Sequence, residues 1–354
     1  MRRILLLAVA ALSVLPSWSA APRQTFARRR PAVSGRAAKQ AVPQKSVSSP
    51  VQGDHCRSPY VGAIVVNADT GDVIFEDNAD REAYPASVTK LMTLLLVMED
   101  VRAGKYALDD KVSVSADVRY SVPSCVGLKA GDRMSVFDLC AALMVKSAND
   151  AAMALGAHSA GAWDAFVARM NARAAELGMK GTRFYNPNGL QPTDVDSRGR
   201  VTRFPWKSTN VTTARDQALL ARRLVKMPEV LSLTAIKTCD LVKTSDGFRV
   251  SVTLRTNEPR RATELASGEE MGGTFVNHNN VMVKDKLKIL NPDGKEAVDG
   301  MKTGYTRDAG SSVVLTGSRR GKRAIVVVLG SSSSKERDEH ARRLLSDALG
   351  ALAW

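Results

Sequence analysis

The sequence predicts an α+β fold in which one antiparallel sheet, flanked by helices, is built from strands at both ends of the folded region. Short apolar runs bounded by turn residues occur near its start, at 62–66 and 73–75, and again near its end, at 297–330. Several segments with helical periodicity lie between them and predict an inserted helical subdomain. The region spans about 300 residues, enough to bury a substantial core.

The first half of this region predicts a hairpin followed by a buried helix. The two early strands flank Asp69-Thr70-Gly71, a turn signal. Residues 90–101 are apolar on nearly all sides, which is typical of a helix inside a domain. Further helices are expected at 135–145, 149–158, 162–177 and 214–226.

Beyond Thr238 the pattern changes to strands. Segments 239–242 and 248–254 flank Asp246-Gly247 and predict a second hairpin. Residues 258–273 are charged and contain glycines, so a loop is expected there. The chain then closes with strands at 297–303, 311–317 and 324–330 and an amphipathic helix at 335–352.

Residues 1–20 predict a secretory signal peptide. Arg2 and Arg3 precede the apolar run from Ile4 to Leu15, and small residues near position 20 offer a cleavage site. The run is shorter than the roughly 18 residues of a membrane span, and no later segment reaches that length. We therefore expect an exported protein, with an uncleaved N-terminal anchor as the alternative.

Residues 21–54 predict a disordered basic linker. Seven lysines and arginines occur between Ala21 and Gly53 without an acidic residue. Much of the formal charge of +15 therefore lies outside the folded part, residues 55–354. The linker is expected either to bind an anionic envelope surface or to be a solvated leader. Nucleic acid is not an expected partner, because basic and aromatic residues are not interleaved.

The cysteines fit an oxidising compartment, where four of them allow three pairings. They are Cys56, Cys125, Cys140 and Cys239. Cys140 lies in an apolar helical stretch and would also suit a buried thiol. No cysteine has zinc-binding spacing to a histidine, so neither a metal nor another cofactor is expected.

Three motifs together contain the groups needed for acyl transfer through a serine ester. They are Ser87-Val88-Thr89-Lys90, Ser147-Ala148-Asn149 and Lys302-Thr303-Gly304. A Ser-x-x-Lys match alone is expected about once by chance, and Ser332 begins a second one. Context separates the two, because Ser87 precedes a buried helix whereas Ser332 precedes a polar one. Likewise, Ser147 lies at a helix break and Lys302 at the end of a strand.

The first two motifs predict the reacting groups. Ser87, the candidate nucleophile, lies at the positive end of a helix dipole, and Lys90 is one turn further on the same face. Taken singly, these two would suit a helix cap and a surface charge. Burial and the nearby charge of Lys302 are expected to lower the pKa of Lys90 and free a neutral amine, a base. Ser147 is then expected to relay the proton, and Asn149 to hold the substrate amide.

The third motif predicts a binding edge. Gly304 lets a substrate backbone run beside the strand, and Lys302 and Thr303 would bind a carboxylate. The backbone N–H groups of Ser87 and Tyr305 are the expected oxyanion donors. His278 is a further candidate for substrate binding, although the histidines show no pairing typical of a Ser-His-Asp triad.

At these motifs the chain resembles the penicillin-recognising serine D,D-peptidases, specifically the low-molecular-mass D-alanyl-D-alanine carboxypeptidases (peptidase S11), over about residues 56–352. The matching segments are 84–93, 177–190 with Asn186-Pro187-Asn188-Gly189-Leu190, and 298–306. The resemblance implies the DD-peptidase/β-lactamase-like fold, an acyl-enzyme on Ser87 with Lys90 as base, and covalent inhibition by β-lactams.

Three features depart from this family pattern. His278 stands where the family often has arginine, so recognition of a terminal carboxylate is expected to be weaker or pH-dependent. Extra sequence near 193–208 and 243–273 is expected to reshape the cleft. The chain stops at its closing helix, so neither the family's second β-domain nor a C-terminal membrane anchor is expected.

The sequence therefore favours a periplasmic or envelope-associated D,D-carboxypeptidase that removes the terminal D-alanine of peptidoglycan stem peptides. A D,D-endopeptidase that cleaves cross-links is the alternative. A β-lactamase is less favoured, because residues 186–190 contain no plausible deacylating glutamate. From a different class, a catalytically silent wall-binding module would keep the pocket without the reaction.

Overall fold

The structure, a computed structural model, describes residues 57–121, 123–195, 201–253 and 265–353. The predicted signal peptide, the basic linker and Cys56 lie outside these residues. No helix in the described ranges is long and apolar enough to cross a membrane.

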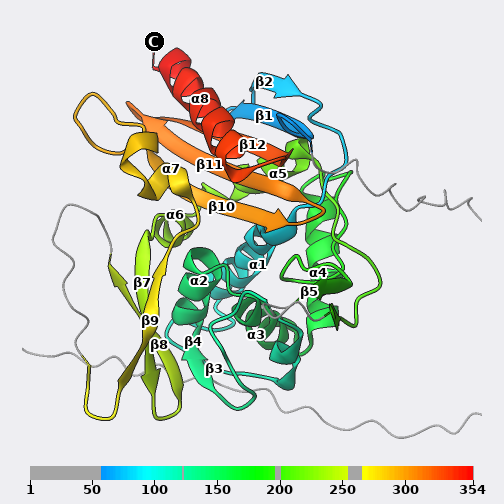
Figure 1. The fold of residues 1–354 in the computed structure, drawn as a ribbon, viewed down its shortest axis with the longest axis vertical. Coiled ribbons are helices and arrows are strands. Elements are labelled where there is room, and N and C mark those ends of the chain that lie inside the picture. Colours follow the sequence, from blue (N-terminus) through cyan, green and yellow to red (C-terminus); the bar gives the residue numbers. More distant parts are fainter. Residues whose placement is uncertain (1–56, 122, 196–200, 254–264, 354) are drawn as a thin grey trace, which may run out of the picture. The chain divides into compact units, whose positions relative to one another are not determined.

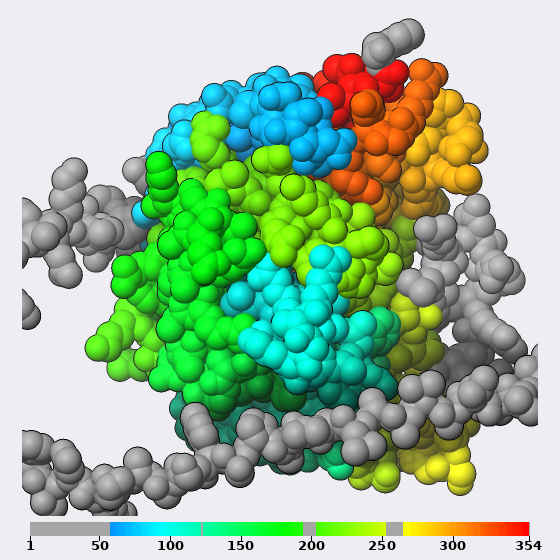
Figure 2. Space-filling view, turned by 180° about the vertical axis from the view of Figure 1, so that it is seen from behind, coloured from blue at the N-terminus to red at the C-terminus, as the bar shows by residue number. Residues whose placement is uncertain are grey.

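A five-stranded antiparallel sheet joins the two ends of the described chain. Its order is β10-β11-β12-β1-β2. The strands are β1 (Gly62–Asn67), β2 (Val73–Asp77), β10 (Val298–Thr306), β11 (Gly310–Arg319) and β12 (Lys322–Ser331). Figure 2 shows the N-terminal strands in blue beside the C-terminal elements in orange and red. The prediction of one sheet assembled from both termini is confirmed.

Strands β1, β11 and β12 of this sheet are buried on both faces, whereas the edge strand β2 is exposed. Along β12, Val326 and Val328 pack with the C-terminal helix α8 (Ser334–Leu352), whereas Ile325 and Val327 pack with the helices of the other side. Successive side chains of a strand point to opposite faces, so a continuous apolar strand needs cover on both. Figure 1 shows α8 along one face.

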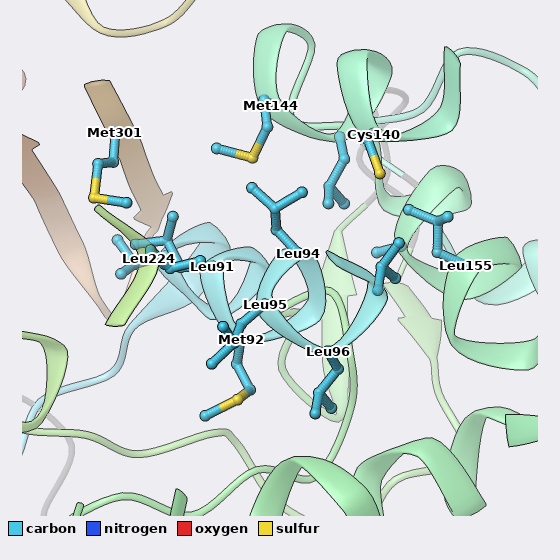
Figure 3. Packing of buried hydrophobic residues seen from close by; sticks show 14 of the residues in the cluster. Leu91, Met92, Leu94, Leu95, Leu96, Cys140, Met144, Leu155, Leu224 and Met301 are labelled. Atoms are coloured by element: carbon cyan, nitrogen blue, oxygen red, sulfur yellow. The ribbon is translucent and has the colours of Figure 1, made fainter. Parts of the chain in front are cut away.

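Helix α1 (Lys90–Arg102) lies at the centre of the larger core. Its leucines are fully or almost fully buried, as its all-round apolar pattern predicts. Figure 3 shows the neighbours of α1 from other elements: Cys140, Met144, Leu155, Leu224 and Met301. The surrounding helices are α2 (Val136–Val145), α3 (Asn149–Ala160), α4 (Trp163–Glu176), α5 (Ala214–Leu224) and α6 (Pro228–Thr234).

The predicted helix break before α3 is confirmed. Helix α2 ends at Val145 and α3 begins at Asn149. Between them Ser147 has a φ of +59°, an uncommon backbone conformation for a residue other than glycine. The break turns Ser147 out of both helices, which positions its hydroxyl independently of them.

A second five-stranded sheet, which the sequence did not predict as a unit, has the order β3-β4-β8-β7-β9. Its strands are β3 (Lys111–Ser113), β4 (Arg133–Ser135), β7 (Thr238–Thr244), β8 (Gly247–Thr253) and β9 (Glu270–Val276). The expectation of a loop through 258–273 is wrong for its last four residues, which begin β9. This edge strand contains glycines and is held by backbone pairing to β7, a long-range contact that local propensity does not reveal.

The remaining elements are short. They are the 3-10 helices η1 (Ala86–Thr89), η2 (Ala116–Tyr120) and η3 (Asp285–Leu287), the helix α7 (Asn280–Val283) and the hairpin β5 (Thr193–Val195) with β6 (Val201–Arg203). That hairpin lies within the extra sequence near 193–208. In the described part of the chain Cys125, Cys140 and Cys239 are free thiols, and Cys140 is buried as expected.

Candidate active site

The fold brings the three motifs together from separate elements. Ser87 lies in η1, Lys90 begins α1, Ser147 lies in the α2–α3 break, and Lys302 lies in β10. The expectation that Lys302 ends its strand is wrong, because β10 continues to Thr306. Backbone pairing to β11 runs without a break from Gly300 to Thr306 and holds the Lys302 segment in the sheet.

Lys90 lies at the centre of the cluster. Its Nζ is 2.8 Å from Ser87 Oγ, 2.7 Å from Asn149 Oδ1 and 2.7 Å from the carbonyl oxygen of Asn188. The side chain is fully buried, whereas Ser87 is half-buried. The amine therefore contacts the candidate nucleophile away from bulk water, while part of Ser87 stays exposed.

The environment of Lys90 disfavours its charged form. Burial, together with the positive charge of Lys302, lowers the pKa of Lys90 well below its ordinary value, and the carboxylate of Asp150 partly opposes this. Both causes were predicted from the sequence. A lysine with a lowered pKa carries the lone pair that a proton acceptor needs.

Lys302 faces the second motif. Its Nζ is 3.0 Å from Ser147 Oγ and 3.0 Å from the carbonyl oxygen of Thr303. Burial and the charge of Arg337 lower the pKa of Lys302 to about 7. Two acceptors leave one N–H of an ammonium group for an anion, so Lys302 can bind a carboxylate beside Ser147.

Gly304 has a second role that sequence reasoning missed. A Cβ atom at Gly304 would lie 2.5 Å from the carbonyl oxygen of Pro85 and 3.2 Å from the backbone nitrogen of Ser87. The glycine thus lets β10 approach the turn that carries the nucleophile. Thr303 is buried beside it, and the next residue, Tyr305, is 67% exposed at the strand edge.

His278 lies at the periphery of the cluster, two residues beyond the end of β9 at Val276. Desolvation of its ring, and then the charges of Lys302, Lys146, Lys90 and Arg337, lower the pKa of His278 to about 4, although the residue as a whole is exposed. At neutral pH the imidazole is uncharged, so it can donate a hydrogen bond to a carboxylate but adds no positive charge.

Asn188 is a site residue to which sequence reasoning gave no role. Its main-chain carbonyl accepts a hydrogen bond from Lys90, and its neighbour Gly189 lies against the backbone of Ala86 and Ser87. The sequence feature that could have indicated this role is the segment Asn186-Pro187-Asn188-Gly189-Leu190, which resembles the D,D-peptidase family. Because the acceptor is a main-chain carbonyl, the type of side chain at position 188 does not indicate this role.

The described residues include no group of three or more His, Cys, Asp or Glu side chains that could hold a metal ion. The groups that do converge are two amines, two hydroxyls and amide or carbonyl acceptors. This set suits proton transfer and anion binding around a serine.

Curated D-alanyl-D-alanine carboxypeptidases are similar to this chain over most of its length. D-alanyl-D-alanine carboxypeptidase DacF of Bacillus subtilis is 30% identical over 286 residues, which cover 81% of this chain and 61% of that protein. The chain spans about three fifths of the length of the curated relatives that it matches, such as DacF of Bacillus subtilis and DacC of Escherichia coli.

Solved structures show the same fold. The D-alanyl-D-alanine carboxypeptidase DacD from Francisella tularensis has a TM-score of 0.67 and 28% identity, covering 82% of this chain and 70% of that one. Penicillin-binding protein D2 from Listeria monocytogenes, in its ampicillin-bound form, has a TM-score of 0.58 and 28% identity, covering 82% and 98%. The family model described as D-alanyl-D-alanine carboxypeptidase (Peptidase_S11) matches residues 61–333, and the chain belongs to that family.

Proposed function

We propose that this protein is a serine D,D-carboxypeptidase that removes the terminal D-alanine from peptidoglycan stem peptides. The proposal includes residues 55–354 as its catalytic domain, and an exported, periplasmic or envelope-associated site of action. Membership of the family supports the reaction, and the contacts of Lys90 support the chemistry.

The contacts of Lys90 carry the proposal. A neutral amine has two N–H groups and one lone pair, and Asn149 Oδ1 and Asn188 O accept from the two N–H groups. The lone pair is then directed at the third neighbour, the hydroxyl of Ser87, 2.8 Å away. Lys90 can accept the proton of Ser87 as its oxygen attacks the substrate carbonyl.

The substrate would lie along the edge of β10. Its terminal carboxylate would bind Lys302 and Thr303, with His278 as an uncharged donor nearby, and the substrate would also contact Tyr305 of the same strand. The backbone N–H groups of Ser87 and Tyr305 would stabilise the oxyanion. Ser147, whose Oγ is 3.0 Å from Lys302 Nζ, would relay to the leaving amine the proton that Lys90 takes from Ser87, and would itself end as a hydroxyl again. Asn149 would hold the substrate amide while its Oδ1 accepts from Lys90.

β-Lactams are the expected covalent inhibitors. The ampicillin-bound relative from Listeria supports this, and the same nucleophile and oxyanion donors would open the lactam ring. The basic linker is a candidate for contact with an anionic envelope surface.

Labelling with a fluorescent penicillin tests the proposed nucleophile. Wild-type protein should form a stable covalent adduct, and Ser87→Ala should form none. Ser332→Ala is the matched control, because Ser332 begins the chance Ser-x-x-Lys match, is exposed and bonds Glu336. An adduct that survives in Ser87→Ala would refute the nucleophile, and an adduct that hydrolyses quickly would indicate a β-lactamase.

Mass spectrometry of muropeptide products then separates the two peptidase activities. Monomeric pentapeptides should lose one alanine. If cross-linked dimers are separated and monomers stay intact, the protein is an endopeptidase. If penicillin adducts form but neither muropeptide is cleaved, the protein is a catalytically silent module that binds the cell wall and penicillin.

The acylation rate should depend on pH with two limbs. It should rise as Lys90 loses its proton, and it should fall near pH 7, where free Lys302, with a pKa of about 7, loses the charge that binds the carboxylate. Lys302→Arg should move the alkaline limb to higher pH, because guanidinium does not titrate there. The second-order acylation rate against pH measures both limbs. An alkaline limb that stays in place in Lys302→Arg would assign it to another group.

A further inference from the structure

Residues 123–128, here called the Ser124 loop, run beside the second motif without forming a helix or strand. The backbone N–H of Asn149 donates to the carbonyl oxygen of Ser124 over 2.7 Å. Ser124 Oγ also lies 3.4 Å from the carbonyl oxygen of Lys146. The loop is therefore attached to both sides of the break that carries Ser147.

The buried carboxylate of Asp150 holds the other end of this loop. Asp150 is 1% exposed, and its Oδ2 accepts from the backbone nitrogens of Val126, Gly127 and Leu128 over 3.0, 2.8 and 3.0 Å. Its Oδ1 accepts from Ala151 N. Four N–H groups directed at one carboxylate offset much of the cost of burying its charge.

Leu128 and Val126 of the loop pack on the main core, but the side that Cys125 and Gly127 share is less well packed. A cavity of about 340 Å³ lies against it, lined by Arg119, Cys125, Lys129, Asp150 and mainly small apolar residues. A segment beside a cavity lacks the close packing that would otherwise fix it. Besides the core contacts of Leu128 and Val126, the hydrogen bonds to Asp150 and Asn149 are therefore what fixes the position of its backbone.

Asp150 follows Asn149 directly, and this links the loop to the amine. Asn149 accepts from Lys90 through its side chain and donates to Ser124 through its backbone. We propose that Asp150 is a positioning residue that clamps the Ser124 loop and thereby keeps Ser147 and Asn149 in place around Lys90. Its catalytic consequence rests on the proposed function, whereas the clamp itself does not.

Asp150 also acts on the charge of Lys90. Lys90 faces Lys302 from β10 and Asp150 from α3, with His278 beyond β9. Around Asp150 lie Lys90 and Cys125, and Arg119 and Lys129 line the cavity. The negative charge of Asp150 raises the pKa of Lys90 against the other causes, so its removal should lower that pKa further.

Asp150→Asn removes the negative charge and one of the two oxygens that accept hydrogen bonds from the backbone. The asparagine keeps one acceptor oxygen, but its NH₂ group would face backbone N–H donors. Asp150→Glu keeps the charge but places the carboxylate about one methylene too far. The matched control is Asp132→Asn, since Asp132 accepts from Lys129 N in the next turn and is only half-buried.

Two measurements report on the hydrogen bonds between Asp150 and the Ser124 loop. Alkylation by a maleimide, located by peptide mass spectrometry, should modify Cys125 about tenfold faster or more in both Asp150 variants, because local opening exposes it. Buried Cys140 should stay unmodified. Acylation by penicillin should slow about tenfold to a hundredfold in Asp150→Asn, as expected for misplaced reacting groups. Its acid limb should move to lower pH, whereas in Asp150→Glu the limb should stay. Asp132→Asn should behave as wild type.

Wild-type rates of both Cys125 modification and acylation in Asp150→Asn would overturn the proposal. If Asp150→Asn unfolds and exposes Cys140 too, hydrogen exchange of the wild type decides. The amides of Val126, Gly127 and Leu128 should then be protected although they belong to no helix or strand, and exchange at the rate of a free peptide would refute the clamp. A wild type that fails to acylate would refute the proposed function and leave these two loop readouts valid.

Discussion

Replacing Lys90 with methionine is expected to slow the acylation of Ser87 on the order of a thousandfold, within the range that a positioned general base contributes. Methionine has a similar length and suits the buried space, but it has no lone pair basic enough to take the proton of Ser87. The time course of fluorescent penicillin incorporation measures the rate. A thermal unfolding midpoint near that of wild type shows that the fold is intact.

The matched control for this change is Lys335→Met. Lys335 completes the chance Ser-x-x-Lys match and is exposed at the start of α8, so its loss should leave the rate unchanged. A Lys90→Met protein that keeps more than a tenth of the wild-type rate would show that another group takes the proton. Ser147 would then be the next candidate, through its contact with Lys302.

The parts of the fold that follow local patterns were predictable from sequence. The all-round apolar character of α1, the break before Asn149 and the continuous apolar run of β12 each reflect residues close together in the chain. The second sheet does not. Strands β3 and β4 have three residues each, and β4 meets β8 through one parallel pair, Arg133 with Gly247. Such pairing depends on tertiary contacts that no short window contains.

The residues of the candidate site likewise fall into those that sequence motifs reveal and those whose role depends on the fold. Ser87, Lys90, Ser147 and Lys302 carry functional side chains within motifs, and the structure brings them together. The role of Asn188 was missed because it acts through its backbone carbonyl. The steric role of Gly304 depends on Pro85, more than 200 positions away in the sequence. The position of His278 near three lysines and Arg337 is likewise a property of the fold. It keeps the imidazole uncharged, whereas an arginine there would bring a positive charge.

Gly189→Ala is expected to impair both stability and acylation severely. Gly189 has a φ of +89°, and a Cβ atom there would lie 1.9 Å from the carbonyl oxygen of Ala86 and 3.1 Å from the backbone nitrogen of Ser87. The backbone must move, and the atoms in its way belong to the nucleophile turn. Displacing that turn by ~1 Å should reduce the acylation rate by about a hundredfold. The rate of penicillin incorporation and the thermal unfolding midpoint measure the two effects.

Gly178→Ala separates this clash from the strain of the left-handed backbone. Gly178 has a φ of +75°, but a Cβ atom there meets nothing within 4 Å. It should therefore lose only the conformational cost of about 1–2 kcal/mol in stability and keep its acylation rate. If both variants lose the same stability and both acylate normally, the close approach of Gly189 to the turn has no catalytic consequence. A loss of acylation in Gly189→Ala alone would instead show that residues 186–190 position Ser87 through the contact of Gly189 with the nucleophile turn. The same segment also binds Lys90 through the carbonyl oxygen of Asn188.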